Sequence, residues 1–273
     1  VLVLFINRGL KLLQYIPAQA LDKTYLARVT LGRTTDTYDA CGETTAVHPH
    51  PINVTKEQIL ETLRGFVGEY LQKPPSFSAV KVKGKRAYDL ARQGVALDLP
   101  ERPVHVSSIR LIRDYESGGS RHLVLRIHCS RGTYIRSLAH DLGHTLGCGA
   151  HLSYLLRERV GVWSIHQSIA PRVIERRESV LALSGFMPLD RILPYPRVVI
   201  NHEAEARIRH GNPLDPRDIR SISAEHVSTP EEADEQSLVQ VFSENGEFLA
   251  LYKPDRTRVE RGQGRLQPVR ILV

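Results

Sequence analysis

The chain has 273 residues, 41% of them hydrophobic and 25% charged, which is typical of a soluble globular protein with room for two domains. The net charge is +7, and its excess lies in residues 1–190, which hold 25 Lys and Arg against 17 Asp and Glu. This charge favours a polyanionic partner such as nucleic acid, bound mainly by the first part of the chain. The apolar opening run Val1–Ile6 is too short to span a bilayer.

In chain order, Val1–Ile6 is predicted to form a buried strand, and a short helix over residues 10–15 follows it. Residues 25–31 alternate apolar and polar side chains, which predicts a second strand. They run into residues 33–40, where Thr and Asp side chains favour turns. Residues 55–58 then form a capping box, Thr-Lys-Glu-Gln, that predicts the start of a helix.

A basic hairpin is predicted over residues 72–92, where prolines stiffen the entry and Gly84 breaks the run. Phe77 and Tyr88 lie among its basic side chains, an interleaving that suits a nucleic-acid groove. A merely solvated face is the alternative interpretation. The six basic residues are Lys73, Lys81, Lys83, Lys85, Arg86 and Arg92.

The most informative segment is residues 123–146, which read as a strand, a glycine turn at Gly132 and a helix. Tyr134 and Arg136 come at the helix entrance, where backbone N–H groups and the helix dipole favour negative charge. A ring and a cation there suit a base on its phosphate backbone, or a carboxylate that needs a partner. The alternative is structural, with the tyrosine covering a core and the arginine capping a loop.

A further helix is predicted over residues 150–159, and the proline-rich residues 193–196 are the best domain boundary. Beyond them, a small β-rich domain is predicted from four short apolar runs, at residues 198–200, 238–242, 248–252 and 269–272. Residues 215–236 are polar and are expected to form a loose surface loop.

No dinucleotide or Walker motif is present. His140 and His144 imitate a zinc-binding pair with Cys148 four residues on, but the intervening acid is Asp141 rather than the longer Glu of zinc proteases. A metal hydrolase is therefore the weakest alternative. The odd number and wide spacing of Cys41, Cys129 and Cys148 argue against a disulfide framework and predict a cytoplasmic protein.

Four blocks, in order, resemble the bacterial TruB-type tRNA pseudouridine synthases. They are Lys23-Thr24-Tyr25 with residues 31–43, Pro74–Lys81 with Gly84, Cys129–Arg136 with residues 141–143, and Leu146–Leu152. The tail resembles the PUA-like domain of those enzymes, with Ile208–Pro213 as a weaker signature.

The resemblance implies an α+β protein, with a mixed or antiparallel-sheet catalytic domain over residues 1–192 and a PUA-like RNA-binding domain over residues 193–273. The implied reaction detaches the T-loop uridine (position 55) of tRNA, rotates the base and rejoins it through carbon, with no cofactor and no metal. The implied partner is the T arm of tRNA, and a monomer without a membrane association is expected.

Matching blocks also imply roles for single residues. Tyr25 is expected to stack on the flipped base, Tyr134 to line the same pocket, and Leu155 to pack on the base from the following helix. Arg136 is expected to orient the nucleophilic aspartate, and Lys11 aligns with a substrate-binding lysine. The hairpin is expected to grip the tRNA backbone.

One departure concerns the nucleophile, which in this family lies in a Gly-x-Leu-Asp-Pro-x-Ala-x-Gly loop. That loop is absent from the sequence, and Val1–Leu4 aligns with residues just after it. We therefore expect an N-terminally truncated chain, an unpaired Arg136 and an open edge of the central sheet, in a polypeptide that is inactive alone and aggregation-prone. A non-catalytic RNA-binding or tRNA-folding module is the alternative. An in-frame Leu-Asp-Pro upstream would support the enzyme, and its absence would support the module.

Overall fold

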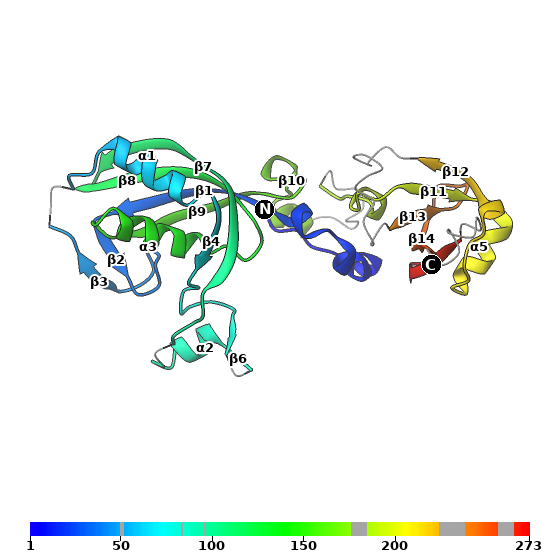
Figure 1. The fold of residues 1–273 in the computed structure, drawn as a ribbon, viewed down its shortest axis with the longest axis horizontal. Coiled ribbons are helices and arrows are strands. Elements are labelled where there is room, and N and C mark those ends of the chain that lie inside the picture. The colour runs from blue at the N-terminus through cyan, green and yellow to red at the C-terminus, as the bar shows by residue number, and fades with distance from the viewer. Residues whose placement is uncertain (50–51, 83, 96, 176–184, 224–237, 256–264) are drawn as a thin grey trace. The chain divides into compact units, whose positions relative to one another are not determined.

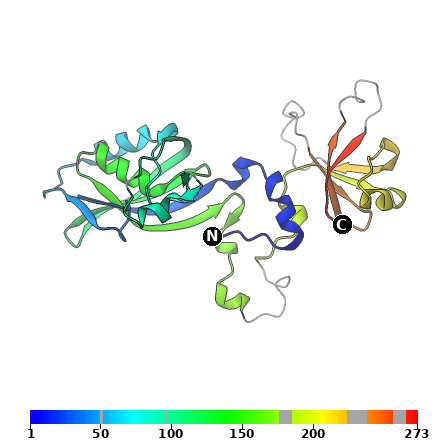
Figure 2. The ribbon, with the colours of Figure 1, turned by 90° about the horizontal axis from the view of Figure 1, so that it is seen from below.

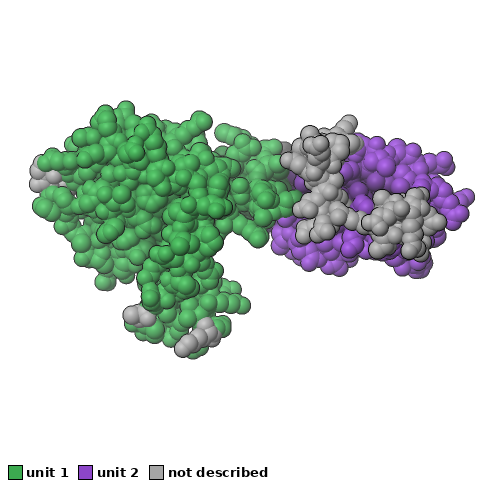
Figure 3. Space-filling model, viewed as in Figure 1, with its two compact units in different colours: residues 1–3, 17–168 green, residues 4–16, 169–273 purple. Residues whose placement is uncertain are grey.

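The computed structural model describes residues 1–273 except 50–51, 83, 96, 176–184, 224–237 and 256–264. The chain forms two compact units, residues 1–3 with 17–168 and residues 4–16 with 169–273 (Figure 3). Each unit contains its own sheet, and the expected α+β class is confirmed. The boundary expected at residues 192 and 193 stays a prediction.

The first unit is built on a six-stranded antiparallel sheet in the order β10-β9-β1-β8-β7-β4 (Figure 1). Its central strand is β1, which pairs with β8 on one side and β9 on the other. The strands are β1 (Lys23–Leu31), β4 (Gly68–Gln72), β7 (Arg102–Ser117), β8 (Ser120–Cys129), β9 (Ala150–Val160) and β10 (Trp163–Ser164).

Two helices, α1 (Lys56–Gly65) and α3 (Ile135–Thr145), cover one face of this sheet (Figures 1 and 2). The predicted capping box opens α1, because the Thr55 side chain accepts from the Gln58 N–H and the Gln58 side chain accepts from the Thr55 N–H. Alternate residues of β1 and β8 pack against the helices in one core, as the period-2 pattern predicts.

Smaller elements surround this core. β2 (Arg33–Thr35) pairs with β3 (Thr44–Val47), and β5 (Lys81–Val82) pairs with β6 (Lys85–Arg86). The latter pair leads into α2 (Ala87–Ala91) and forms the predicted basic hairpin, which projects from the sheet in Figure 1.

The second unit contains a five-stranded sheet in the order β12-β11-β13-β14-β15, over which α5 (His202–Arg209) packs. All four strands predicted here form, and β12 is an additional strand that was not predicted. The strands are β11 (Arg197–Ile200), β12 (Ile219–Ser223), β13 (Val239–Phe242), β14 (Phe248–Pro254) and β15 (Leu266–Ile271).

Short helical turns complete the described chain: η1 (Asn7–Tyr15), η2 (Ala18–Leu21), η3 (Ile165–Gln167), α4 (Pro171–Ile174), η5 (Leu189–Arg191) and η6 (Pro216–Asp218). η6 and β12 occupy the start of the polar segment expected to be a loop, and its residues 224–236 lie outside the described residues. None of the described helices is long and apolar enough to cross a membrane.

Two predicted elements are wrong. Residues 150–159 form strand β9 rather than a helix, since their leucine spacing fits either element and the free side of β1 provides a partner along its whole length. Val1–Ile6 forms no strand, and Leu2 and Leu4 are exposed. A strand needs a neighbour to satisfy its N–H and C=O groups, and these residues form no ladder with a described strand, although Val1 bonds to Arg157 of β9.

The edges of the six-stranded sheet are β10 and β4. β10 covers only the end of β9, at Val160 and Arg159, and residues 38–40 bond to β9 at Leu152. Between Ser153 and Glu158, the outer side of β9 pairs with no described strand, although Val1 bonds to Arg157. On the β9 side the expected open edge is therefore limited to this short stretch, β4 forms the other edge, and aggregation stays a prediction.

Candidate active site

Three segments far apart in the sequence meet at the N-terminus of α3. β8 ends at Cys129, Gly132 adopts a left-handed φ of 88°, and Tyr134 is the N-cap of the helix. The predicted strand, turn and helix are thus all present. The other two segments are the turn-rich residues 36–41 and the proline-containing residues 72–78.

Arg136, in the first turn of α3, is paired rather than free. Its Nη1 donates to Asp39 Oδ2 at 3.1 Å and to the Thr37 carbonyl at 3.3 Å, while Nη2 donates to the Phe77 carbonyl at 2.7 Å. The expectation of an unpaired Arg136 is wrong because Asp39, which sequence analysis did not connect with Arg136, supplies the carboxylate.

Asp39 is held in place by its own turn. Its Oδ1 accepts from the Thr37 hydroxyl at 2.8 Å and from the Cys41 N–H at 3.0 Å, which leaves Oδ2 for Arg136. Both side chains of the pair remain about one quarter exposed. The pair therefore faces solvent in part, and a charge-assisted hydrogen bond is favourable there.

Gln72 ties the proline-containing segment to the helix entrance. Its side-chain oxygen accepts from the Tyr134 N–H at 2.8 Å, and its side-chain nitrogen donates to the Tyr134 carbonyl at 3.1 Å and to the Tyr70 hydroxyl at 2.7 Å. The Ser137 hydroxyl donates to the Lys73 carbonyl at 2.7 Å. Gln72 is almost fully buried, so its amide fixes the backbone from which Tyr134 and Arg136 project.

The Tyr134 side chain is half-buried and packs against the base of the hairpin, where Val80, Ala87 and Leu99 form a small apolar cluster. The hairpin and the helix entrance are therefore one packed assembly. A substitution in either one is expected to shift the packing of the other.

Tyr25 lies on the helix-covered face of the sheet, in the same core as Ile135 of α3. Burial raises the pKa of its phenol, and a hydrogen bond with the Arg157 guanidinium opposes that rise. The phenol is therefore neutral at pH 7 and can donate a hydrogen bond or present its ring, but it is not a base.

Leu155 is brought beside Tyr25 by strand pairing. Ala27 faces Leu155 and Tyr25 faces Arg157 in the register of β1 and β9, so the two side chains are diagonal neighbours on one face. Leu155 therefore acts from a strand rather than a helix, and its side chain is 43% exposed. An exposed leucine next to a tyrosine ring is suited to contact with a flat apolar ligand face.

The other predicted site residues lie apart from this group. Lys11 is exposed on η1 in the second unit, and its role stays a prediction. Lys83 lies outside the described residues. Lys73 pairs with Asp98 at the hairpin base, with Nζ 2.5 Å from Oδ1.

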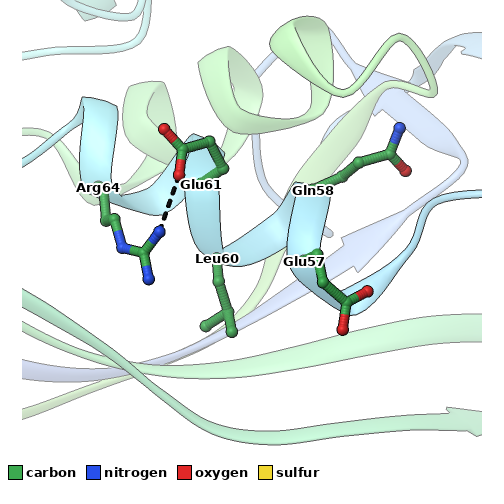
Figure 4. Close-up of a pocket in the computed structure, with 5 residues that line it drawn as sticks. All are labelled: Glu57, Gln58, Leu60, Glu61 and Arg64. Carbon is green, nitrogen blue, oxygen red and sulfur yellow. Dashed lines mark hydrogen bonds and ion pairs between the residues drawn. The ribbon is translucent and has the colours of Figure 1, made fainter.

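The remaining hairpin residues border an open cavity of about 860 Å³, lined by Lys81, Lys85, Arg86, Arg92 and others. Tyr88 is flanked by two guanidinium groups, those of Arg86 and Arg92, at 5.8 and 5.6 Å from its ring centre. A second cavity, of about 400 Å³, follows α1 and is lined by Glu57, Gln58, Leu60, Glu61 and Arg64 (Figure 4).

Neither of these cavities contains Tyr25, Tyr134 or Arg136. The single cleft expected for the three is therefore not among them. The structure links Tyr134 and Arg136 through α3, and it links Tyr25 to them through the shared core beneath that helix.

The metal alternative gains no support. His140 stacks on Tyr38, with ring centres 3.9 Å apart, and burial lowers its pKa. Among the residues described, no three His, Cys, Asp or Glu side chains form a metal-binding group. Cys41, Cys129 and Cys148 are free thiols.

One aspartate that the sequence interpretation did not weigh is Asp215, in the tripeptide Leu214-Asp215-Pro216 of the second unit. It lacks the flanking Gly, Ala and Gly of the family loop. Its carboxylate lies 3.0 Å from the Arg265 Nε and forms a capping box for η6. Asp215 therefore has a structural role, in pairing with Arg265 and in capping η6.

Sequence reasoning missed Asp39, Gln72 and Arg157 as members of the site. Asp39 lies in a block quoted for the resemblance, so that block was the available signal. Gln72 comes directly before Lys73-Pro74-Pro75, and a polar residue that precedes a stiff segment carries no signal of burial. Arg157 was hidden because its strand was predicted as a helix.

Comparison with known proteins identifies the family. The model of the TruB family pseudouridylate synthase (N terminal domain) matches residues 1–135. The tRNA pseudouridine synthase B of Thermotoga maritima is 37% identical over 265 residues, 94% of this chain and 77% of that protein. That of Solibacter usitatus is 39% identical over 229 residues, 82% and 75% of the two chains.

Solved structures agree with the fold. A chain of a Cbf5-Nop10-Gar1 complex superimposes with a TM-score of 0.61 at 22% identity, over 98% of this chain and 71% of that chain. A chain of an H/ACA RNP bound to a substrate RNA containing 2'-deoxyuridine gives a TM-score of 0.62 at 21% identity, over 98% and 70%. With the geometry at α3 and these relatives together, the chain belongs to the TruB family of pseudouridine synthases.

Proposed function

We propose that this protein is a tRNA pseudouridine synthase that isomerises the T-loop uridine (position 55) to pseudouridine. The observation that carries the proposal is the meeting of three matching blocks at the N-terminus of α3, with Arg136 bonded to Asp39 and to the Phe77 carbonyl. The names of the relatives support tRNA as the substrate.

In this proposal the uridine is flipped out of the T loop at a cost of a few kcal/mol, which stacking on the Tyr25 ring offsets by about 1–3 kcal/mol. Leu155 contacts the other side of the base, and Tyr134 lines the pocket. The glycosidic bond to nitrogen breaks, the base turns, and a bond to carbon forms, with one ring proton lost and one gained. No electrons are exchanged, so the reaction needs no redox partner.

Arg136 is proposed to orient the nucleophilic carboxylate. Its Nη1 and Nη2 already donate hydrogen bonds. Its Nε–H has no acceptor among the described residues and is free to donate to the incoming carboxylate. Because the Gly-x-Leu-Asp-Pro-x-Ala-x-Gly loop is absent from the sequence, we propose that the nucleophile lies in such a loop upstream of Val1. The hairpin cations, with Tyr88, are proposed to hold the RNA backbone.

The test uses the polypeptide 1–273 and a T-arm RNA hairpin. Nucleosides are analysed after digestion, and binding is compared with the hairpin whose target uridine is replaced by adenosine. We expect at least fivefold preference for the uridine hairpin and no pseudouridine. Equal binding of the two hairpins would contradict the uridine pocket. Pseudouridine formation would show that the nucleophile lies within residues 1–273.

A non-catalytic RNA-binding module is the second candidate, and the open hairpin cavity favours it, since a basic surface needs no nucleophile to hold RNA. The same experiment separates the two. A binding module has no reason to distinguish uridine from adenosine at one position of the loop, whereas a uridine pocket has.

A further inference from the structure

The face of the first unit's sheet opposite α1 and α3 carries an ordered set of basic and aromatic side chains. Strand pairing fixes which residues share this face, because directly paired residues point the same way. One row across the sheet runs Arg113, Val124, Arg28, Tyr154, and the next runs Arg110, Arg126, Leu26, Leu156. The flanking rows are Tyr115, His122, Thr30 and Ser108, His128, Thr24, Arg159.

This face is uncovered in the part of the chain that the structure describes. Arg110, Arg113, Arg126 and Arg159 are exposed, and so is Tyr154, with half of its side-chain surface accessible. Both helices of the core, α1 and α3, lie on the other side (Figures 1 and 2). An open antiparallel sheet backed by helices is a surface on which single-stranded RNA is bound elsewhere.

The charge of the face is strongly one-sided. Two carboxylates of the described strands lie on this face. Glu158 forms a two-bond pair with Arg126 at 2.9 and 3.2 Å, and Glu69 of β4 is placed there by its pairing with His105. Asp114 and Glu116 pair with Leu123 and Arg121 and so belong to the helix-covered side. No described carboxylate pairs with the other four guanidinium groups, those of Arg28, Arg110, Arg113 and Arg159.

Flat rings accompany the charges. The Arg113 guanidinium lies 4.7 Å from the Tyr115 ring centre, and the Tyr115 and His122 rings are 5.1 Å apart. Tyr154 lies three strand spacings away on β9, about 14 Å across the sheet. Rings at this separation, with guanidinium groups between them, match the bases and phosphates of one strand of RNA.

We propose that this sheet face is a second RNA-binding surface, which takes a single strand by stacking bases on Tyr154 and on the Arg113–Tyr115 pair. The guanidinium groups of Arg28, Arg110 and Arg159 pair with its phosphates. The surface is separate from the uridine site, which faces the helices, and it rests on the proposed function only in having RNA as its partner. An acidic protein is the other occupant that the charge allows.

The test measures binding of a fluorescein-labelled 12-nucleotide oligoadenylate to the full chain by fluorescence anisotropy at low salt. Oligoadenylate contains no uridine, so its binding is independent of the uridine pocket. The variants are Arg110→Gln with Arg113→Gln, and separately Tyr154→Thr, both replacements that strands tolerate. The matched control is Lys56→Gln with Arg64→Gln on α1, which removes the same charge from the helix side.

We expect the arginine variant to bind at least fivefold more weakly, with a shallower dependence of log affinity on log salt, and Tyr154→Thr at least threefold more weakly. The control should stay within twofold of the parent chain. Face variants that retain their circular dichroism spectra and bind within twofold of the control would overturn the proposal. So would an oligoglutamate that competes as well as unlabelled oligoadenylate, since the face would then select an acidic protein.

Discussion

At the scale of single residues, Arg136 is the structural link between α3 and the two other site segments. Replacing it with Ala leaves Asp39 Oδ2 and the Phe77 carbonyl without their donor. We expect a loss of about 2–3 kcal/mol in the free energy of unfolding, below the range for fully buried pairs because the pair is partly exposed. Urea unfolding measures it, with Arg136→Lys, which keeps the charge but not the two-pronged geometry, as the intermediate case.

That account fails if Arg136→Ala unfolds within 0.5 kcal/mol of the parent, roughly the scatter of a surface substitution. Asp39→Asn serves as the partner control. It keeps an acceptor for Arg136 Nη1 and should cost less than Arg136→Ala.

Gln72 is predicted to contribute as much to the free energy of unfolding as the Arg136–Asp39 pair does. Gln72→Leu fills the same space but leaves the N–H of Tyr134 without a partner, while the Tyr134 C=O keeps only its bond from the Leu138 N–H, and we expect a cost of about 1–3 kcal/mol. Gln72→Glu keeps the acceptor and should cost less at pH 5 than at pH 8, since the protonated acid can also donate. Equal stability of Gln72→Leu and the parent in urea would show that the clamp contributes nothing.

At the scale of elements, close packing of α3 on the start of β9 explains a glycine in the motif Asp141-Leu142-Gly143. A Cβ at Gly143 would lie 2.2 Å from the Ala150 N and 2.4 Å from the Gly149 carbonyl carbon. Backbone cannot yield as a flexible side chain does, so Gly143→Ala is expected to destabilise by about 3 kcal/mol. Thermal unfolding checks it against Gly65→Ala, where a Cβ meets nothing within 4 Å.

Asp141, on the same helix, is predicted to make stability depend on pH. Burial raises its pKa to about 6, with His144 opposing and Glu101 adding to the rise. The folded state therefore keeps a proton that the unfolded state loses at about pH 4, so stability falls as pH rises from 4 to 6 and stays lower above that. Partial exposure of the carboxylate reduces the effect to about 1 kcal/mol.

Asp141→Asn removes this penalty. Its unfolding free energy should exceed that of the parent at pH 8 and match it near pH 3.5, where the acid is protonated in both states. The difference between the two proteins, measured by urea unfolding across this range, isolates Asp141 from the other carboxylates. A constant difference at all pH values would contradict the raised pKa.

Elements whose apolar residues follow one clear spacing were predictable from the sequence. Elements whose apolar spacing fits both a helix and a strand were not. β1 and β8 alternate along their whole length, and Thr55 to Gln58 marks the start of α1 by its own hydrogen bonds. Residues 150–159 carry leucines at spacings that fit a helix or a strand. They form a strand because the second side of β1 needs a hydrogen-bonding partner. The same long-range dependence hid the Arg136–Asp39 pair, whose members are 97 residues apart.

At the scale of the whole molecule, the sequence indicated two domains and a basic first part, while the residues that join the units were less predictable. Residues 4–16 belong with the second unit, where the Tyr195 hydroxyl donates to the Tyr15 carbonyl at 2.6 Å. Composition gives no sign that this segment bonds to a residue 180 positions later in the chain. The family blocks located the site, and the fold brought those blocks to one helix entrance.

The central claim is that a uridine stacks on Tyr25 beneath the α3 entrance. A T-arm RNA with 5-fluorouridine at the target position tests it by fluorine NMR, since a base that leaves the RNA stack for a protein ring changes its fluorine shift. The parent chain and Tyr25→Phe, which keeps the ring, should give the same new resonance, and Tyr25→Leu should lose it while still binding the RNA. The same resonance in Tyr25→Leu would contradict the claim.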